Sequence, residues 1–167
     1  MIPALNDALP IDQTLQPGNE LKSLALEDSF ADFDLLRRTL LKTNAFRFHL
    51  TRARTLEEAR LARARQSFDI AFIDYNLGVE SGVRFLQELG GRDGQTVPIL
   101  ITGLPDPQIY DVALKAGALG LINKTDLTPT LLETTIRSAL HTKAVERKFL
   151  QIITAITANQ PRAALNS

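Results

Sequence analysis

A regular alternation of short apolar runs with segments of helical spacing is the feature that most constrains what this chain can fold into. Between residues 21 and 140 the pair repeats five times, and the apolar runs are four to six residues long. Runs of this length are typical of strands, whereas the segments between them place their apolar residues on one face of a helix. Strands that alternate with helices form βαβ units. The sequence therefore predicts an α/β fold with a mainly parallel sheet.

Residue patterns indicate the bounds of each element. We predict strands over residues 21–26, 46–50, 70–73, 97–101 and 119–122, and helices over 32–41, 55–66, 81–89, 106–115 and from about 128 into the 150s. Thr55 ahead of Glu58 is typical of a helix N-terminus, and Pro129 falls at a first helical position. The uninterrupted apolar run of residues 70–73 suits a central strand with both faces covered, whereas the alternation in residues 46–50 suits a half-buried edge strand.

Bulk composition argues against several classes of function. The chain has 167 residues, enough for one domain with short extensions. Lys plus Arg number 19 and so do Asp plus Glu, which argues against nucleic acid or an anionic membrane as a partner. The absence of cysteine excludes a disulfide framework, thiol catalysis and thiolate-bound zinc. No apolar run reaches the ~20 residues that are needed to cross a bilayer. A secretion signal would require a basic residue near its start, and none precedes Lys22. We therefore expect a cytoplasmic protein.

Polar residues at the ends of the predicted strands could form a site. In a parallel α/β sheet, ligands bind outside the carboxyl ends of the strands. The residues at these ends are, in chain order, Glu27, Asp28, Asp74, Thr102 and Lys124. We expect their side chains to lie together, because the carboxyl ends of parallel strands meet at one edge of the sheet.

The chemistry of this set is suited to phosphoryl transfer. Three clustered carboxylates repel one another and require a cation, and oxygen ligands of this kind favour Mg²⁺. Asp74 could then act as a nucleophile and form an acyl phosphate. Lys124 would offset the charge of the transferred group, and Thr102 would donate its hydroxyl to a phosphoryl oxygen.

Residues 21–140 resemble the receiver domains of bacterial two-component response regulators. The five matches, in the family's order, are the acidic pair in Leu26-Glu27-Asp28, the phosphoacceptor in Phe72-Ile73-Asp74-Tyr75-Asn76-Leu77, the glycine Gly82, the hydroxyl residue in Ile99-Leu100-Ile101-Thr102-Gly103, and the lysine in Gly117-Ala118-Leu119-Gly120-Leu121-Ile122-Asn123-Lys124. The chain departs from the family at Leu121, where an aromatic residue is frequent, at Thr125, where proline usually follows the lysine, and at Gly78, where proline is frequent.

The resemblance implies a flavodoxin-like, doubly wound (βα)5 fold with strand order 2-1-3-4-5. It also implies phosphotransfer to Asp74 from a sensor histidine kinase or a histidine phosphotransfer protein. The implied Mg²⁺ ligands are Glu27, Asp28, Asp74 and the backbone carbonyl of Asn76. Such a chain would be a stand-alone phospho-switch and not an enzyme. It would contact a downstream protein through the face of the fourth helix, fifth strand and fifth helix, and would not bind DNA or a membrane directly.

The regular pattern covers only part of the chain. We predict a flexible leader over residues 1–20, a receiver domain over 21–141, and a helical extension and tail over 142–167. In the extension, four apolar residues are spaced four, three and four apart, which resembles a coiled-coil seam: Val145, Phe149, Ile152 and Ile156. The last helix could fold back on its own domain, or this seam could dock a partner or form a homodimer, and both alternatives stay open.

Three other functions compete with a phosphorylated receiver. A degenerate receiver would act as an interaction module without phosphorylation. A haloacid-dehalogenase-like phosphatase also uses an aspartate nucleophile, but it needs a second aspartate where Asn76 stands, and its acidic pair comes last in the chain. A flavin mononucleotide protein of the same topology would need a phosphate-binding loop where Glu27 and Asp28 stand. The arginines between residues 52 and 65 alternate with Glu57 and Glu58, so we interpret them as a solvated face rather than a nucleic-acid patch.

Overall fold

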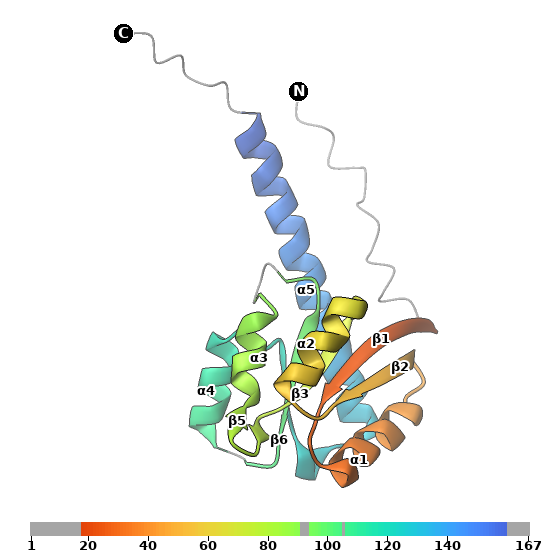
Figure 1. The fold of residues 1–167 in the computed structure, drawn as a ribbon. Helices are drawn as coiled ribbons and strands as arrows, with labels where there is room; N and C mark the ends of the chain where they lie inside the picture. The colour runs from red at the N-terminus through yellow and green to blue at the C-terminus, as the bar shows by residue number, and fades with distance from the viewer. Residues whose placement is uncertain (1–17, 91–93, 105, 160–167) are drawn as a thin grey trace.

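Five parallel strands form the central sheet of the protein (Figure 1). The computed structural model describes residues 18–90, 94–104 and 106–159. The strands of the sheet are β1 (Asn19–Leu26), β2 (Phe46–Ala53), β3 (Ile70–Asp74), β6 (Val97–Thr102) and β7 (Gly120–Asn123). They lie in the order β2-β1-β3-β6-β7, and each neighbouring pair is parallel. This order confirms the predicted 2-1-3-4-5 arrangement, because β4 and β5 form a separate hairpin.

Helices cover both faces of the sheet, as the predicted doubly wound fold requires. One face packs against α1 (Phe30–Leu41) and α5 (Pro129–Ala158), and the other packs against α2 (Leu56–Arg65), α3 (Gly82–Glu88) and α4 (Pro107–Lys115). In β3, Ile70 and Phe72 point into the first layer, whereas Ala71 and Ile73 point into the second. Every residue of β3 and β6 is buried, which explains why these strands are uninterrupted apolar runs.

The element bounds differ from the predicted ones mainly at the ends. The strand β1 begins at Asn19 rather than at residue 21, because Gly18 donates its N–H to Ala45 and Asn19 pairs with Phe46. Two residues of the predicted leader are therefore part of the sheet, and residues 1–17 lie outside the described part of the chain. Thr55 caps α2 and accepts from the N–H of Glu58, as predicted.

Three short elements were not predicted. The strands β4 (Asn76–Leu77) and β5 (Glu80–Ser81) form a hairpin directly after β3. Its two-residue turn places Gly78 at a φ of 74°, in the left-handed region that favours glycine. This conformation explains why glycine, and not proline, stands at this position. A single turn of 3-10 helix, η2 (Lys124–Asp126), joins β7 to α5.

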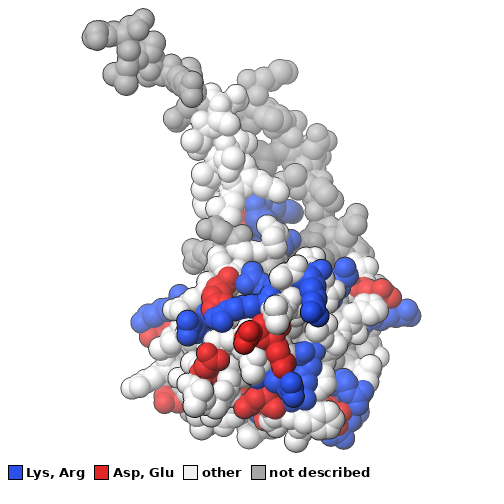
Figure 2. Space-filling view, viewed as in Figure 1, with Lys and Arg blue, Asp and Glu red and all other residues white. Residues whose placement is uncertain are grey.

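The helix α5 continues well beyond the domain. Its last buried residue is Ala144, and every residue from Phe149 to its end at Ala158 is exposed. Figure 1 shows this distal part extending away from the sheet, so the alternative in which it folds back on its own domain is wrong. Figure 2 shows charges of both signs mixed over the visible face of the domain, whereas residues 149–158 at the distal end of the helix are uncharged. Among the described residues, no helix has the length and apolar content that a membrane span requires.

Candidate functional site

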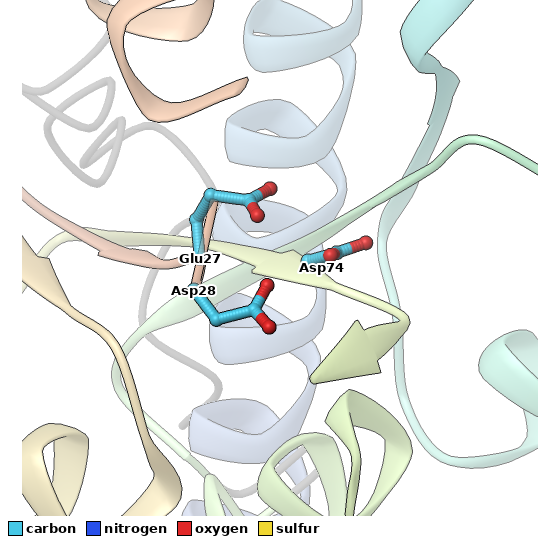
Figure 3. A group of neighbouring side chains, drawn as sticks. All are labelled: Glu27, Asp28 and Asp74. Atoms are coloured by element: carbon cyan, nitrogen blue, oxygen red, sulfur yellow. The ribbon is translucent and has the colours of Figure 1, made fainter. Parts of the chain in front are cut away.

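Three carboxylates meet at the C-terminal edge of the sheet. Glu27 and Asp28 directly follow β1, and Asp74 is the last residue of β3. One oxygen from each lies within 4.8 Å of the others, and Figure 3 shows the three carboxyl groups directed to the same side of the strand ends. Glu27 and Asp74 are buried, while Asp28 is exposed. The structure therefore brings together the acidic residues that the sequence had placed at strand ends.

The turn that carries Glu27 and Asp28 is fixed from two sides. The Glu27 carboxylate accepts a hydrogen bond of 3.0 Å from the backbone N–H of Ser29, the residue that caps α1. From the neighbouring strand β2, Arg52 donates to the carbonyl oxygens of Glu27 at 3.2 Å and Asp28 at 2.7 Å. The same guanidinium lies 5.2 Å from the ring centre of Phe33, within cation–π range. Arg52 thus fixes the backbone of the acidic pair and is not part of a freely solvated face.

Close packing fixes the backbone of Asp74. Gly82, the first residue of α3, donates its N–H to the carbonyl of Tyr75 at 2.9 Å. A methyl group at this glycine would collide with the carbonyl oxygen of Asp74 and would lie 2.7 Å from a side-chain carbon of Ile73. Glycine is needed here because the helix passes directly against the main chain of the acidic residue, which explains its place in the sequence motif.

Lys124 links the carboxylates across the sheet. Its Nζ lies 2.8 Å from Glu27 Oε2, 3.2 Å from Asp74 Oδ2 and 2.7 Å from Asp32 Oδ2. The first two contacts follow from the predicted site, but Asp32 was not predicted. It lies in the first turn of α1, three residues after the cap Ser29, in the pattern of a capping box. Glu27 already accepts from the Ser29 N–H, and the Asp32 side chain is bonded to Lys124.

Burial and neighbouring charges shift the pKa values of three of these groups. Removal from water raises the pKa of Glu27 from 4.5 to about 7, and the Asp74 charge adds to the rise, although Lys124 opposes it. Burial likewise raises the pKa of Asp74 against the opposing effect of Lys124. Burial alone would lower the pKa of Lys124, but hydrogen bonds to Asp32 and Glu27 outweigh burial and raise that pKa. The site therefore holds a firmly charged ammonium beside two carboxyl groups that are costly to ionise.

An open pocket of about 390 Å³ lies in front of these groups. Its lining residues are Asp28, Asp32, Asp74, Asn76, Gly78, Thr102, Gly103, Leu104 and Lys124. Thr102 is buried at the end of β6, and its hydroxyl oxygen accepts from the N–H of Leu104 at 3.1 Å, which leaves the hydroxyl hydrogen available to donate. Thr102 and Asn76 thus line the same pocket as Asp74 and Lys124.

This arrangement can do two things chemically. Three carboxylates contact one ammonium group, and Asp28 lies beside two of them, so the excess of negative oxygen ligands suits a hard divalent cation. The pocket also places an aspartate oxygen, an ammonium group and a hydroxyl around one space, which suits a phosphoryl group. Of the departures from the family pattern, Gly78 lines the pocket, whereas Leu121 lies on β7 and Thr125 in η2. Leu121 packs against the core on the second face of the sheet, and the N–H of Thr125 donates to Asn123 at 3.0 Å.

Comparisons with solved structures support the same fold. A CheY-like receiver domain protein from Methanospirillum hungatei superposes with a TM-score of 0.62 and 24% identity, covering 75% of this chain and 98% of that one. The receiver domain of a diguanylate cyclase from Desulfovibrio desulfuricans gives a TM-score of 0.63 at 25% identity, with 75% and 98% covered. A receiver domain of a LuxO-type repressor from Vibrio parahaemolyticus gives 0.64 at 19% identity, with 81% and 98% covered.

Sequence comparison agrees with the structural likeness. The response regulator protein PilR of Pseudomonas aeruginosa is 32% identical over 103 residues, which are 62% of this chain and 22% of PilR. The chain thus spans about a fifth of the length of this relative. The family model of the response regulator receiver domain matches residues 24–137, from β1 into α5, and includes every residue of the site described above. With the fold, the site and this match in agreement, the chain belongs to the response regulator receiver domain family.

Proposed function

We propose that this protein is a Mg²⁺-dependent phosphoacceptor that takes a phosphoryl group on Asp74. The observation that carries the proposal is the buried Asp74 carboxylate, 3.2 Å from the Lys124 ammonium and grouped with Glu27 and Asp28. An isolated carboxylate at a strand end would need neither the ammonium nor the two other acids. The donor would be the phosphohistidine of a sensor kinase or of a histidine phosphotransfer protein, and the chain would act as a signalling module rather than an enzyme.

The transfer forms one bond and breaks one bond. A carboxylate oxygen of Asp74 attacks the phosphorus of the donor, a P–O bond forms, and the P–N bond to the donor imidazole breaks with its electron pair left on the imidazole. Lys124 offsets the charge that the phosphoryl oxygens bring into the pocket. The Thr102 hydroxyl donates to one of those oxygens. The product is an acyl phosphate on Asp74.

The acidic residues fit a magnesium ion. Glu27, Asp28 and Asp74 offer oxygens within 4.8 Å of one another, and the raised pKa of Glu27 reflects a buried negative charge that Lys124 does not fully compensate. Oxygen ligands of this kind suit Mg²⁺, and the backbone carbonyl of Asn76 would complete the set. The ion would supply positive charge to the phosphoryl oxygens, in addition to that of Lys124.

A downstream protein would bind the face formed by α4, β7 and α5. Three large apolar side chains are exposed on α4 and on the loop that leads to it: Leu104, Val112 and Leu114. The loop begins directly after Thr102, so contact of its hydroxyl with a phosphoryl group would alter this surface. We propose a cytoplasmic location for this exchange, and a receiver unit that spans the predicted residues 21–141 together with residues 19 and 20, which extend β1. Amide exchange that is identical across residues 103–124 in both phosphorylation states would contradict this route of output.

Two alternatives predict different outcomes. A degenerate receiver would keep the fold and its surfaces without phosphorylation, and Leu121, where the family often has an aromatic residue, favours this alternative. A phosphatase of the haloacid dehalogenase type would turn over phosphate esters without a stable label. The exposed Asn76 lacks the acidic group that such an enzyme requires two residues after its nucleophile.

The test is to incubate the protein with Mg²⁺ and acetyl phosphate and to measure its intact mass. We expect the gain of one phosphoryl group, its loss when Mg²⁺ is removed, and its absence in Asp74→Asn. Asp111→Asn removes a carboxylate that pairs with Lys115 on the surface of α4, and this control should label like the wild type. If neither acetyl phosphate nor a phosphohistidine protein labels the wild type, the degenerate receiver becomes the better explanation.

A further inference from the structure

The helix α5 carries an uncharged stripe along its whole length. The stripe consists of eight uncharged residues, which are separated alternately by four and by three positions along the helix: Leu131, Thr135, Ser138, Thr142, Val145, Phe149, Ile152 and Ile156. This is the a and d spacing of a two-stranded coiled coil. The first half of the stripe consists mainly of small polar residues beside the domain, and the second half consists of large apolar residues.

The domain leaves most of this stripe open. The buried residues of α5 lie on another side of the helix: Leu132, Ile136, Ala139, Leu140, Lys143 and Ala144. Thr135 lies at the border, half-buried beside Gly120 of β7. On the stripe, the side chains beyond the domain are 52% exposed at Val145, 63% at Phe149, 51% at Ile152 and 61% at Ile156. Figure 1 shows that no other described element lies along this distal part. A helical segment of this length is marginal in water unless its apolar face is covered.

We infer that a second copy of this chain covers the stripe, in a parallel, in-register pair of α5 helices. A stripe with a and d spacing is complementary to itself about a two-fold axis, where each residue meets its own counterpart. Because all eight positions are uncharged, no like charges oppose each other across that axis. Parallel pairing matches the stripe over its whole length, whereas an antiparallel pair would place the two domains at opposite ends and could join the distal apolar halves alone.

The chemistry of the distal helix distinguishes a second copy from a membrane surface. Helices that lie on membranes carry Lys and Arg on their polar face. Residues 149–159 contain no charged side chain, and the polar positions are held by Gln151, Thr154, Thr157 and Asn159. This composition suits burial against another uncharged helix and not attraction to anionic lipid.

The apolar area is close to what a specific interface needs. The five large apolar residues of the stripe together expose the equivalent of about two and a half fully accessible side chains: Leu131, Val145, Phe149, Ile152 and Ile156. At roughly 150–200 Å² for each large side chain, every copy would bring about 375–500 Å². Specific interfaces bury at least about 1,000 Å² in total, or about 500 Å² from each copy. The pair is therefore at the small end of the range, and its formation should depend on protein concentration.

The experiment measures the mass of the full chain by sedimentation over a range of micromolar concentrations. We expect the wild type to form dimers as the concentration rises. Ile152→Glu puts a charge on the stripe and should weaken dimerisation by at least about tenfold, since two buried charges would oppose each other. Leu150→Glu is the matched control. Leu150 is 42% exposed, close to the 51% of Ile152, but lies off the stripe, so this variant should still dimerise.

Single cysteines test the register, because the natural chain has none. Oxidation should link Ile156→Cys into covalent dimers and should leave Thr157→Cys, one position off the stripe, largely monomeric. Three results would overturn the proposal: a wild type that stays monomeric, equal loss of dimer in both glutamate variants, or equal crosslinking in both cysteine variants. Labelling of each variant by acetyl phosphate confirms that the domain is folded. A dimer that neither acetyl phosphate nor a phosphohistidine protein labels would leave the pairing intact and contradict the phosphoacceptor role instead.

Discussion

Glu27 should make the magnesium-free protein less stable as the pH rises. Its carboxyl has a pKa of about 7 in the folded protein, raised by burial from 4.5. The folded state therefore binds this proton more tightly than the unfolded state does. Below about pH 4.5 the group is protonated in both states and has no effect on the free energy of unfolding. Between pH 4.5 and 7 that free energy falls, and above pH 7 the full cost of ionising the buried group is present.

The size of the effect follows from the shift. A change from 4.5 to about 7 is 2.5 pKa units, and at 1.36 kcal/mol per unit it corresponds to about 3 kcal/mol. Asp74, whose pKa is also raised by burial, acts in the same direction. Lys124, whose pKa is raised, stays protonated in both states across this window and adds no slope. Because local relaxation and water entry reduce such costs, we expect about 1–3 kcal/mol from Glu27.

The perturbation is Glu27→Gln, which keeps the shape of the side chain and removes its charge. Urea unfolding in the presence of a chelator should show the variant about 1–3 kcal/mol more stable than the wild type at pH 8 and nearly equal to it at pH 4.5. Glu20→Gln, at the exposed start of the same strand, serves as the control and should show no such trend. Added Mg²⁺ should stabilise the wild type at pH 8 much more than the variant. A variant that is less stable than the wild type at pH 8 without Mg²⁺ would refute the reasoning.

Two further substitutions test contacts around the site. Asp32→Asn removes one of the carboxylates bound to Lys124, so the initial rate of labelling by acetyl phosphate should rise about 1.4- to fivefold, the factor that matches the 0.2–1 kcal/mol of a partly exposed ion pair. A fall in that rate would mean that Asp32 instead holds Lys124 in its productive position. Gly82→Ala places a methyl group against the Asp74 carbonyl and should lower the free energy of unfolding by about 1–3 kcal/mol, measured by urea unfolding. Gly103→Ala should be better tolerated in the same assay, because its methyl group would meet only Lys124, at 3.8 Å; an equal loss in both variants would contradict the packing argument.

Burial explains which parts of the fold could be predicted from the sequence. The strands β3 and β6 are covered on both faces, so they had to be continuous apolar runs, and those runs are what the sequence shows. These runs also allowed Asp74 and Thr102 to be predicted at the C-terminal edge of the sheet, since each residue directly follows one of them. The hairpin of β4 and β5 could not be found in this way. Each of its strands has two residues, too few to show any periodicity.

The contacts that the sequence did not predict join residues that lie far apart in the chain and meet only in the folded protein. Asp32 and Lys124 are 92 positions apart, and a carboxylate in the first turn of a helix is usually explained by the cap and the helix dipole alone. Only the structure shows that Glu27 already accepts from the Ser29 N–H. Arg52 was grouped with the arginines that follow it because they share a charge. Its position on β2, beside the carbonyls of Glu27 and Asp28, comes from the pairing of two strands.

The position of Lys124 bears on how the site could communicate with α5. Its ammonium group connects the end of β7 to carboxylates carried by β1, α1 and β3, and α5 begins only five residues later, at Pro129. A phosphoryl group on Asp74 would compete with Glu27 and Asp32 for this ammonium. Leu121 has neither an aromatic ring nor a polar group that could respond to the site, and its partly buried side chain packs against the core. We therefore expect the state of Asp74 to reach α5 through Lys124 and η2, and hence to reach the stripe on which two copies would pair.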